Sequence, residues 1–329
     1  MKLETGVHSR NIIQWAEKHP EAVVLSGDLG TSCDIKEFQK VYPHRYFSFG
    51  LAEQNMVGWA AGLAREGFRP YLHTFGVFLY RRALDQIEMS VAYPNQPVTF
   101  CAFLPGIMTP GGSSHQSIND VAVLRGIPNM TILDTGDVTD VESVLEVAES
   151  ARGPVYIRMV RGELPRLFDA SDRMTLNKAR IISEGTDVAV LSSNVCTEEA
   201  MRATGALREH GLSVQHLHIT TLKPFTDPLV VDALKKVKYG VVTLENHTVL
   251  GGLGTAVADM MAEHAIGKPL IKNGIQDTYT HGASKMYLMK KYGLDALTLV
   301  ESIEKLVGKS FGIKEDELEK VRFVDYTAV

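Results

Sequence analysis

The stretch FGLAEQNMVGWAAGLAREG, residues 49–67, has the pattern of a helix that is smooth on one side. Gly58 and Gly62 are four residues apart, so they lie on the same side of a helix. Because they lack side chains, they allow a neighbouring backbone to approach closely. Three alanines extend the predicted smooth surface, Ala60, Ala61 and Ala64. We therefore predict that this helix packs tightly against a neighbour, with a subunit interface as one option.

A single carboxylate stands at the start of this apolar segment. Burying an unpaired charge is costly, so Glu53 needs a partner or a favourable field. The simpler explanation is the helix macrodipole, which favours a carboxylate at a helix N-terminus by about 0.3–1 kcal/mol. The alternative is a hydrogen bond from Glu53 to a ligand. The residues alone leave both explanations open.

On both sides of this helix, short apolar runs alternate with helical segments. Strands are predicted at residues 22–30, 69–75, 97–103, 129–136 and 154–160, and helices at 51–66 and 78–92. After a polar stretch, 168–185, the pattern restarts with strands at 187–193, 213–219 and 239–246, and with helices at 197–211 and 252–265. A short amphipathic helix is predicted within 314–324.

This βαβα order predicts an α/β protein of two domains, residues 1–175 and residues 176–329. The first domain is expected to hold a mainly parallel sheet with helices on both faces. A chain of 329 residues also suits two domains better than one core. Hydrophobic residues make up 45% and charged residues 22%, as in globular proteins.

Composition also excludes several classes of function. The net charge is −5 and basic residues do not cluster, so no nucleic-acid partner is expected. Three cysteines without paired spacing give neither a disulfide framework nor a CxxC metal site. No apolar run approaches the roughly 20 residues that span a bilayer, and the N-terminus lacks the apolar core of a signal peptide. We therefore expect no membrane association and a cytoplasmic location.

Polar and aromatic residues follow the predicted strands at the point where each strand ends. They are Asp28, Ser32, Glu53, Thr74, Phe75, His115, Arg158 and Arg161. Active sites of open α/β sheets lie at the carboxyl ends of the strands. We therefore expect these side chains to line one cleft.

Each candidate also has a simpler interpretation. Phe75 and Phe78 either belong to the core or form a flat-walled pocket for an aromatic ring. His115 lies in a glycine-rich loop, either as an acid/base or hydroxyl-binding group or as an ordinary surface histidine. Arg158 and Arg161 either bind an anion bidentately or form salt bridges with nearby carboxylates.

The common nucleotide-binding and hydrolase motifs are absent from the sequence. We find no GxxxxGK[ST], GxSxG or HExxH, and no GxGxxG after a strand. The stretch NHTVLGGLGTA, residues 246–256, is glycine-rich and opens a helix, so a phosphate loop has to be considered. It lacks the lysine and the spacing, which favours a turn packed on a helix.

Taken in order, these elements resemble the second half of a transketolase. The matching segments are SGDLGTS (26–32), SFGLAEQNMVGWAAGLAREGFRPYLHTFGVF (48–78), GGSSHQSINDVAVLRGIPNMTIL (111–133), PVYIRMVRGELP (154–165) and LENHTVLGGLGTAVAD (244–259). The resemblance covers most of the chain, and the GLAEQNM element is its most specific part. It implies a pyrimidine-binding domain followed by a transketolase C-terminal domain.

The resemblance also implies that half of the cofactor site lies elsewhere. The first half of the family grips the phosphates of thiamine diphosphate and a metal ion through a GDG followed further on by an Asn. SGDLG at 26–30 is not that signature. The chain is therefore most similar to the C-terminal-half subunit of a split transketolase. A separate, GDG-bearing N-terminal-half subunit would hold the diphosphate and Mg²⁺ (or Ca²⁺ or Mn²⁺), and this chain would hold no metal.

The resemblance assigns the cofactor residues one by one. The glutamate matching Glu53 hydrogen-bonds N1′ of the aminopyrimidine ring. Sharing a proton there favours the imino tautomer, whose nitrogen removes the C2 proton of the thiazolium and gives the ylid. Phe78 matches the aromatic that stacks on the ring, with Phe75 beside it, and Asp28 and Leu29 match positions near the cofactor.

Substrate residues carry over in the same way, with two departures. His115 matches a catalytic histidine that contacts the donor's hydroxyl groups. The resemblance assigns the phosphate of a sugar substrate to Arg10, Ser32 and Arg161, with Arg158 as a further candidate. Gly111 stands where many transketolases have an Asp, and Phe103 where they have a His. These changes imply altered recognition, so a branched, deoxy or sulfonated sugar is credible.

The function expected from the resemblance is transfer of a two-carbon ketol unit from a ketose to an aldose. The active form is expected to be an α2β2 heterotetramer, with the C-terminal domain serving assembly. The first alternative is the beta chain of a 2-oxo acid dehydrogenase decarboxylase, which shares the AEQ helix; the SSHQS loop and RGELP favour transketolase. Chemistry like that of 1-deoxyxylulose-5-phosphate synthase is a second alternative. A non-catalytic assembly subunit is a third, and the retained Glu53 argues against it.

Overall fold

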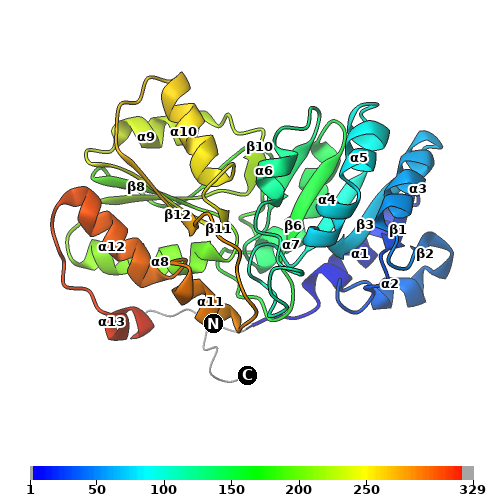
Figure 1. Ribbon diagram of the computed structural model, residues 1–329, viewed down its shortest axis with the longest axis horizontal. Helices are drawn as coiled ribbons and strands as arrows, with labels where there is room; N and C mark the ends of the chain where they lie inside the picture. Colours follow the sequence, from blue (N-terminus) through cyan, green and yellow to red (C-terminus); the bar gives the residue numbers. More distant parts are fainter. Residues whose placement is uncertain (1–2, 321–329) are drawn as a thin grey trace.

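The computed structural model describes residues 3–320 of the chain. Figure 1 shows two α/β lobes side by side, each built on its own sheet. The predicted α/β class and the two-lobed organisation are confirmed. The helix predicted within 314–324 is present as α13 (Glu315–Lys320), and the end of that prediction lies outside the described residues. Within residues 3–320, none of the helices is long and apolar enough to cross a lipid bilayer.

The first sheet has seven strands in the order β10-β5-β6-β4-β3-β1-β2. They are β1 (Ala22–Ser26), β2 (Tyr46–Ser48), β3 (Arg69–Phe75), β4 (Thr99–Phe103), β5 (Thr131–Asp134), β6 (Val155–Met159) and β10 (Thr221–Lys223). Strands β1 to β6 run parallel to one another. Every residue of β1, β4 and β6 is buried, as expected for parallel strands covered on both faces.

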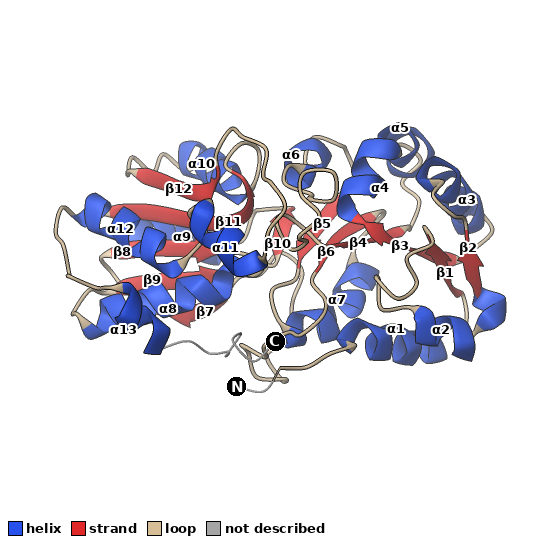
Figure 2. Ribbon diagram, turned by 60° about the horizontal axis from the view of Figure 1, so that its bottom comes forward, coloured by secondary structure: helices blue, strands red, loops and turns tan. Residues whose placement is uncertain are grey.

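Helices cover both faces of this sheet, as the sequence predicted (Figure 2). One face carries α1 (Val7–Lys18), α2 (Lys36–Val41) and α7 (Val138–Ser150). The other carries α3 (Glu53–Arg65), α4 (Gly76–Arg82), α5 (Leu84–Gln86) with the π-helix η2 (Ile87–Ala92), and α6 (Asp120–Leu124). A 3-10 turn, η1 (Pro43–Arg45), precedes β2. The single helix predicted over 78–92 is interrupted at Ala83, whose φ of −119° and ψ of 23° are not helical.

The second sheet has five strands in the order β12-β11-β8-β9-β7. They are β7 (Arg180–Ser183), β8 (Val188–Ser192), β9 (Val214–His218), β11 (Gly240–Thr248) and β12 (Leu270–Ile275). The helices of this lobe are α8 (Cys196–Glu209), α9 (Pro228–Lys236), α10 (Leu253–Glu263), α11 (Lys285–Lys291), α12 (Ala296–Val307) and α13. Only β7 runs antiparallel to its neighbour among the strands of this sheet, all of which lie within the described residues.

One strand departs from the predicted division of the chain. β10 lies in sequence within the second domain, yet it pairs antiparallel with β5 at the edge of the first sheet. The Lys223 ammonium fixes it there by donating to the carbonyl oxygens of Arg125 and Ile127. The first sheet is therefore parallel except for one edge strand, and that strand links the two lobes.

The glycine-rich stretch 246–256 forms a turn before α10. The Glu245 carboxylate accepts hydrogen bonds from the backbone N–H groups of Leu253 (2.6 Å) and Gly254 (2.8 Å) at the start of that helix. Burial raises the pKa of Glu245 to about 7. A Cβ on Gly252 would lie 2.0 Å from the carboxylate, so glycine is needed at that position. The Glu245 carboxylate thus occupies the position at the helix N-terminus where a phosphate loop would bind a phosphate. This supports the interpretation of the stretch as a turn packed on a helix.

Candidate active site

Glu53 is the first residue of α3, and it is buried although it is charged. Its side chain is 1% exposed, because Met56 and Ala60 on the same helix pack into the core and draw the first turn inward. Arg82 supplies the missing partner. Its Nη1 donates to both carboxylate oxygens of Glu53 at 2.9 Å. Thr74 at the end of β3 adds a weaker hydroxyl contact at 3.5 Å.

Four flat groups lie together beside this carboxylate, the rings of Phe75, Phe78 and His115 and the guanidinium of Arg82. The rings of Phe75 and Phe78 stack with an interplanar angle of 25° and centroids 5.6 Å apart. The guanidinium of Arg82 lies over the Phe78 ring, with Cζ 4.1 Å from the centroid. The His115 ring meets Phe78 edge-on at 5.3 Å. The structure thus gathers Glu53 and the three predicted ring-bearing residues at one place.

Arg82 is a site residue that the sequence patterns did not reveal. It belongs to no motif, and it stood within the helix predicted over 78–92 without an assigned role. A signal was nevertheless present. Arg82 follows Phe78 by four residues, a spacing that places both on the same side of a helix.

The end of β1 approaches the same site through a glycine. A Cβ on Gly27 would lie 3.1 Å from the Thr74 hydroxyl and 3.7 Å from a carboxylate oxygen of Glu53. Asp28 and Leu29 follow directly, so the predicted pair borders the site. Asp28 is exposed and has a left-handed φ of 63°, and Leu29 is half-buried.

The loop that holds His115 leaves room for the imidazole through a second glycine. A Cβ on Gly111 would lie 2.9 Å from both Cβ and Cγ of His115. The His115 Nδ1 is 2.9 Å from the Ser114 hydroxyl, and Arg81 fixes the loop by donating to the Ser113 carbonyl at 3.1 Å. Any side chain at position 111 therefore requires the His115 ring to move.

Replacing this glycine tests the position of His115. We expect Gly111→Ala to lower kcat/KM of the assembled enzyme about tenfold to a hundredfold, since small displacements of a catalytic group have effects of this size. The melting temperature should stay unchanged because the loop is exposed. Gly126→Ala is the control, since a Cβ there would meet only the Val123 carbonyl at 3.8 Å. Unchanged kinetics in Gly111→Ala would contradict a role for His115 in this position.

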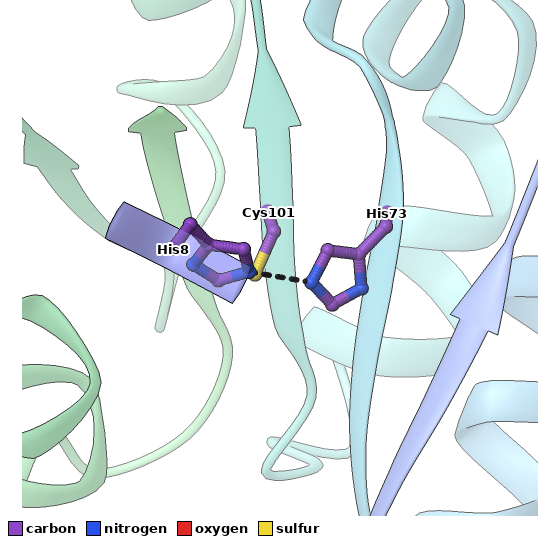
Figure 3. A group of neighbouring side chains, drawn as sticks. All are labelled: His8, His73 and Cys101. Atoms are coloured by element: carbon purple, nitrogen blue, oxygen red, sulfur yellow. Dashed lines mark hydrogen bonds between the residues drawn. The ribbon is translucent and has the colours of Figure 1, made fainter. Parts of the chain in front are cut away.

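Behind the strand ends lies a buried group of three possible metal ligands, His8, His73 and Cys101 (Figure 3). The two Nε2 atoms are 3.0 Å apart, and Nδ1 of His73 lies 3.0 Å from the Tyr71 carbonyl oxygen, to which it donates. His73 Nε2 must then accept, and His8 Nε2 must donate. Burial lowers the pKa of His73 to about 4 and that of His8 well below its usual value, so both rings are neutral. The contact is thus a neutral histidine pair, which no sequence spacing had indicated.

Phe103 belongs to this buried group rather than to the cleft. Its ring is 0% exposed and packs edge-on against His8 at 5.4 Å. Position 103 therefore offers no polar group to a substrate.

The residues expected to hold an anion are only partly brought together. The Arg161 guanidinium lies near the two residues that follow Ser32, since its charge opposes the burial that raises the pKa values of Cys33 and Asp34. Arg161 Nε is buried and has no hydrogen-bond partner among residues 3–320. Arg10 is 54% exposed, and its guanidinium bonds to Thr5 O at 2.6 Å and to Glu4 at 3.5 Å rather than to Ser32 or Arg161.

Arg158 lies between the two lobes and is saturated by the protein itself. Its guanidinium donates to Asp120 (3.1 Å), Asp134 (2.9 Å) and the Asn246 carbonyl (2.8 Å). The side chain is 1% exposed. Of the two interpretations given for Arg158, the structure therefore shows the salt bridges with nearby carboxylates.

The smooth side of α3 is narrower than predicted. Ala60, Ala61 and Ala64 are buried, and Ala60 and Ala64 lie on the side of the helix opposite the glycines. Gly58 and Gly62 face open space, beside a Trp59 that is 53% exposed. A groove along this side is lined by Gln54, Asn55, Gly58, Trp59, Gly62, Leu63 and Glu66. In the part of the chain that the structure describes, no other segment therefore packs against the glycine side of α3.

Comparison with known proteins agrees with this geometry. The family model for the transketolase pyrimidine-binding domain matches residues 5–166, and the one for the transketolase C-terminal domain matches 177–298. A putative uncharacterized transketolase family protein, y4mN of Sinorhizobium fredii, is 35% identical over 88% of this chain and 84% of its own length. The subunit SqwH of a 6-deoxy-6-sulfo-D-fructose transketolase from a Clostridium species is 35% identical over 88% of this chain and 90% of its own length.

A solved structure described as a split gene transketolase, inactive beta4 tetramer, has a TM-score of 0.83 and 33% identity, and the match covers 92% of this chain and 97% of that one. The chain also matches 1-deoxy-D-xylulose-5-phosphate synthases, of which it spans about half the length. The domain boundary near residue 175 stays a prediction. With both domain models matched and relatives of 35% identity covered almost end to end, this chain belongs to the transketolase family, whose members use thiamine diphosphate.

Proposed function

We propose that this chain is the subunit of a split transketolase that supplies Glu53 and the aminopyrimidine pocket. The observation that carries the proposal is the position of Arg82, a planar N–H-bearing group that is hydrogen-bonded to Glu53 and stacked on Phe78. These two contacts are the ones that a flat, nitrogen-bearing ring would make, which supports the proposal. The reaction would be transfer of a two-carbon ketol unit from a ketose to an aldose.

The residues of this chain would prepare the cofactor for that reaction. When bound, thiamine diphosphate supplies an electron sink for cleavage of the bond beside a ketose carbonyl. The Glu53 carboxyl would hold a proton shared with the pyrimidine nitrogen N1′, and Phe78 would orient the ring. Because Glu53 is 1% exposed, water does not compete for that proton.

A second subunit would complete the site. We propose an N-terminal-half transketolase subunit, with a GDG motif that holds the diphosphate and Mg²⁺ (or Ca²⁺ or Mn²⁺), in an α2β2 heterotetramer. The open glycine side of α3, with Trp59 exposed beside it, is the proposed docking surface. In support, the similar solved structure is described as an inactive tetramer of beta chains.

An anionic sugar is the proposed substrate. Within residues 3–320, Arg161 offers a buried N–H without a partner, and it lies near Cys33 and Asp34, which directly follow Ser32. We propose that His115 contacts the hydroxyl groups of the donor, and Arg10 stays a candidate for binding the anionic group. Arg158 is no longer proposed to bind the substrate. Gly111 and the buried Phe103 remove two polar groups from the cleft, which suits a sugar with fewer hydroxyls. A sulfonated sugar is one such candidate, since one relative is a 6-deoxy-6-sulfo-D-fructose transketolase subunit.

Reconstitution tests the split site. We expect the isolated chain to be inactive and to bind thiamine diphosphate weakly. Adding a partner of about 270–300 residues, a size typical of two domains, should restore ketol transfer with Mg²⁺ present. The measurement is transfer from a ketose phosphate or sulfonate to an aldose phosphate, followed by chromatography. Turnover by the isolated chain would contradict the proposal.

The same assembly distinguishes the alternatives. Decarboxylation of a branched or aliphatic 2-oxo acid, without ketol transfer, would identify a dehydrogenase beta chain instead. Condensation of pyruvate with an aldose phosphate would identify chemistry like that of 1-deoxyxylulose-5-phosphate synthase. Assembly without any of these reactions would favour a non-catalytic subunit.

A further inference from the structure

Arg82 makes the two contacts that the proposed function gives to the cofactor's ring. It donates to both oxygens of Glu53 at 2.9 Å, and its guanidinium lies 4.1 Å from the centroid of Phe78. One carboxylate and one ring face cannot serve two planar groups at once. The arginine and an aminopyrimidine would therefore compete for the same place.

The two partners of this ion pair differ in their freedom to move. The Glu53 side chain is 1% exposed and is fixed at the start of α3. The Arg82 side chain is 42% exposed and lies at the end of α4, before Ala83 leaves the helical conformation. Arg82 can therefore swing into solvent and be hydrated there, whereas Glu53 is held in place at the start of its helix.

We propose that Arg82 closes the aminopyrimidine subsite while the cofactor is absent and leaves it when the cofactor binds. This inference rests on the proposed function. In the closed state, Arg82 neutralises a buried carboxylate whose other side-chain contact among the described residues is the neutral Thr74 hydroxyl. Its departure frees both carboxylate oxygens of Glu53 for the incoming ring. The same side chain thus protects Glu53 and opposes premature binding of the cofactor.

The competition has a thermodynamic signature. If Arg82 stabilises only the closed state, then its removal destabilises the cofactor-free protein and leaves the loaded protein unchanged. The affinity for the cofactor then rises, because the open fraction of the protein increases. An occupancy of the closed state of about nine-tenths corresponds to a change of about tenfold in the dissociation constant.

The experiment measures binding of thiamine diphosphate to the reconstituted assembly by calorimetry in excess Mg²⁺. We expect Arg82→Ala to bind thiamine diphosphate about tenfold more tightly than wild type. Its melting temperature should fall without the cofactor and match wild type when saturated. Arg82→Lys, which keeps the charge but not the flat stacking group, should lie between the two. In a Glu53→Gln background, Arg82→Ala should have no effect on affinity, since a neutral amide needs no cation.

An exposed arginine of the second lobe provides a control. Arg208 on α8 donates to the carbonyl oxygens of Glu184 (2.7 Å) and Val214 (3.1 Å), so Arg208→Ala should leave the dissociation constant unchanged. Equal or weaker binding by Arg82→Ala would overturn the inference, as would an equal loss of thermal stability with and without the cofactor. Absence of binding by the wild-type assembly would instead overturn the proposed function.

Discussion

Glu53→Gln is expected to lower ketol transfer by the assembled enzyme by a factor of about 10² to 10⁴, the range for loss of one acid-base group. The substitution keeps the size and shape of the side chain, so the first turn of α3 should remain in place. The amide of Gln cannot share a proton with the pyrimidine nitrogen N1′ as the carboxyl group of Glu53 is proposed to do. The direct measurement is proton–deuteron exchange at C2 of bound thiamine diphosphate, followed by NMR after acid quenching.

Assembly has to be separated from catalysis in this variant. Glu53 lies on the same helix as the proposed docking surface, so the assembly of the variant has to be checked. We expect the Glu53→Gln assembly to elute from a size-exclusion column at the wild-type position. Glu17 on α1 is exposed, and Glu17→Gln is the control with the same change of charge. Normal C2 exchange in a correctly assembled Glu53→Gln enzyme would refute the assigned role.

The backbone of the first sheet could be predicted from the sequence because its strands are continuous apolar runs. β3 was predicted with the bounds that the structure shows, and β1 and β4 within a few residues. β10 could not be predicted as part of this sheet. It has three residues, and its place depends on pairing with β5, more than 80 residues earlier. A local pattern carries no information about such a contact.

In the candidate site too, residues in local sequence patterns could be predicted, whereas residues that depend on long-range contacts could not. Glu53, Phe75 and Phe78 were found because they flank a recognisable helix and a strand end. Arg82 was missed because its role depends on a carboxylate 29 residues away, which only the folded chain brings to it. The glycines of α3 were correctly placed on one side of a helix. Ala60 and Ala64 were wrongly added to that side, since their spacing from the glycines turns them toward the core.

The interdomain arginine should have the largest effect on stability. Removing Arg158 leaves Asp120 and Asp134 buried without their cation, and the Asn246 carbonyl loses a donor. Breaking a buried pair in this way costs about 3–5 kcal/mol. We therefore expect Arg158→Met to lower the free energy of unfolding by about this amount, as measured by urea denaturation. The exposed pair of Arg173 with Glu146 is the control, and Arg173→Met should cost less than about 1 kcal/mol.

The effect should also depend on pH. Burial raises the pKa of Asp134, and the Arg158 guanidinium opposes that shift in the wild type. Without the guanidinium the pKa in the folded variant rises further above its unfolded value, so the folded state binds more protons than the unfolded state. Stability then falls as pH rises through that window. The penalty of Arg158→Met should therefore be larger at pH 8 than at pH 5, and a penalty independent of pH would show that the carboxylates find other partners.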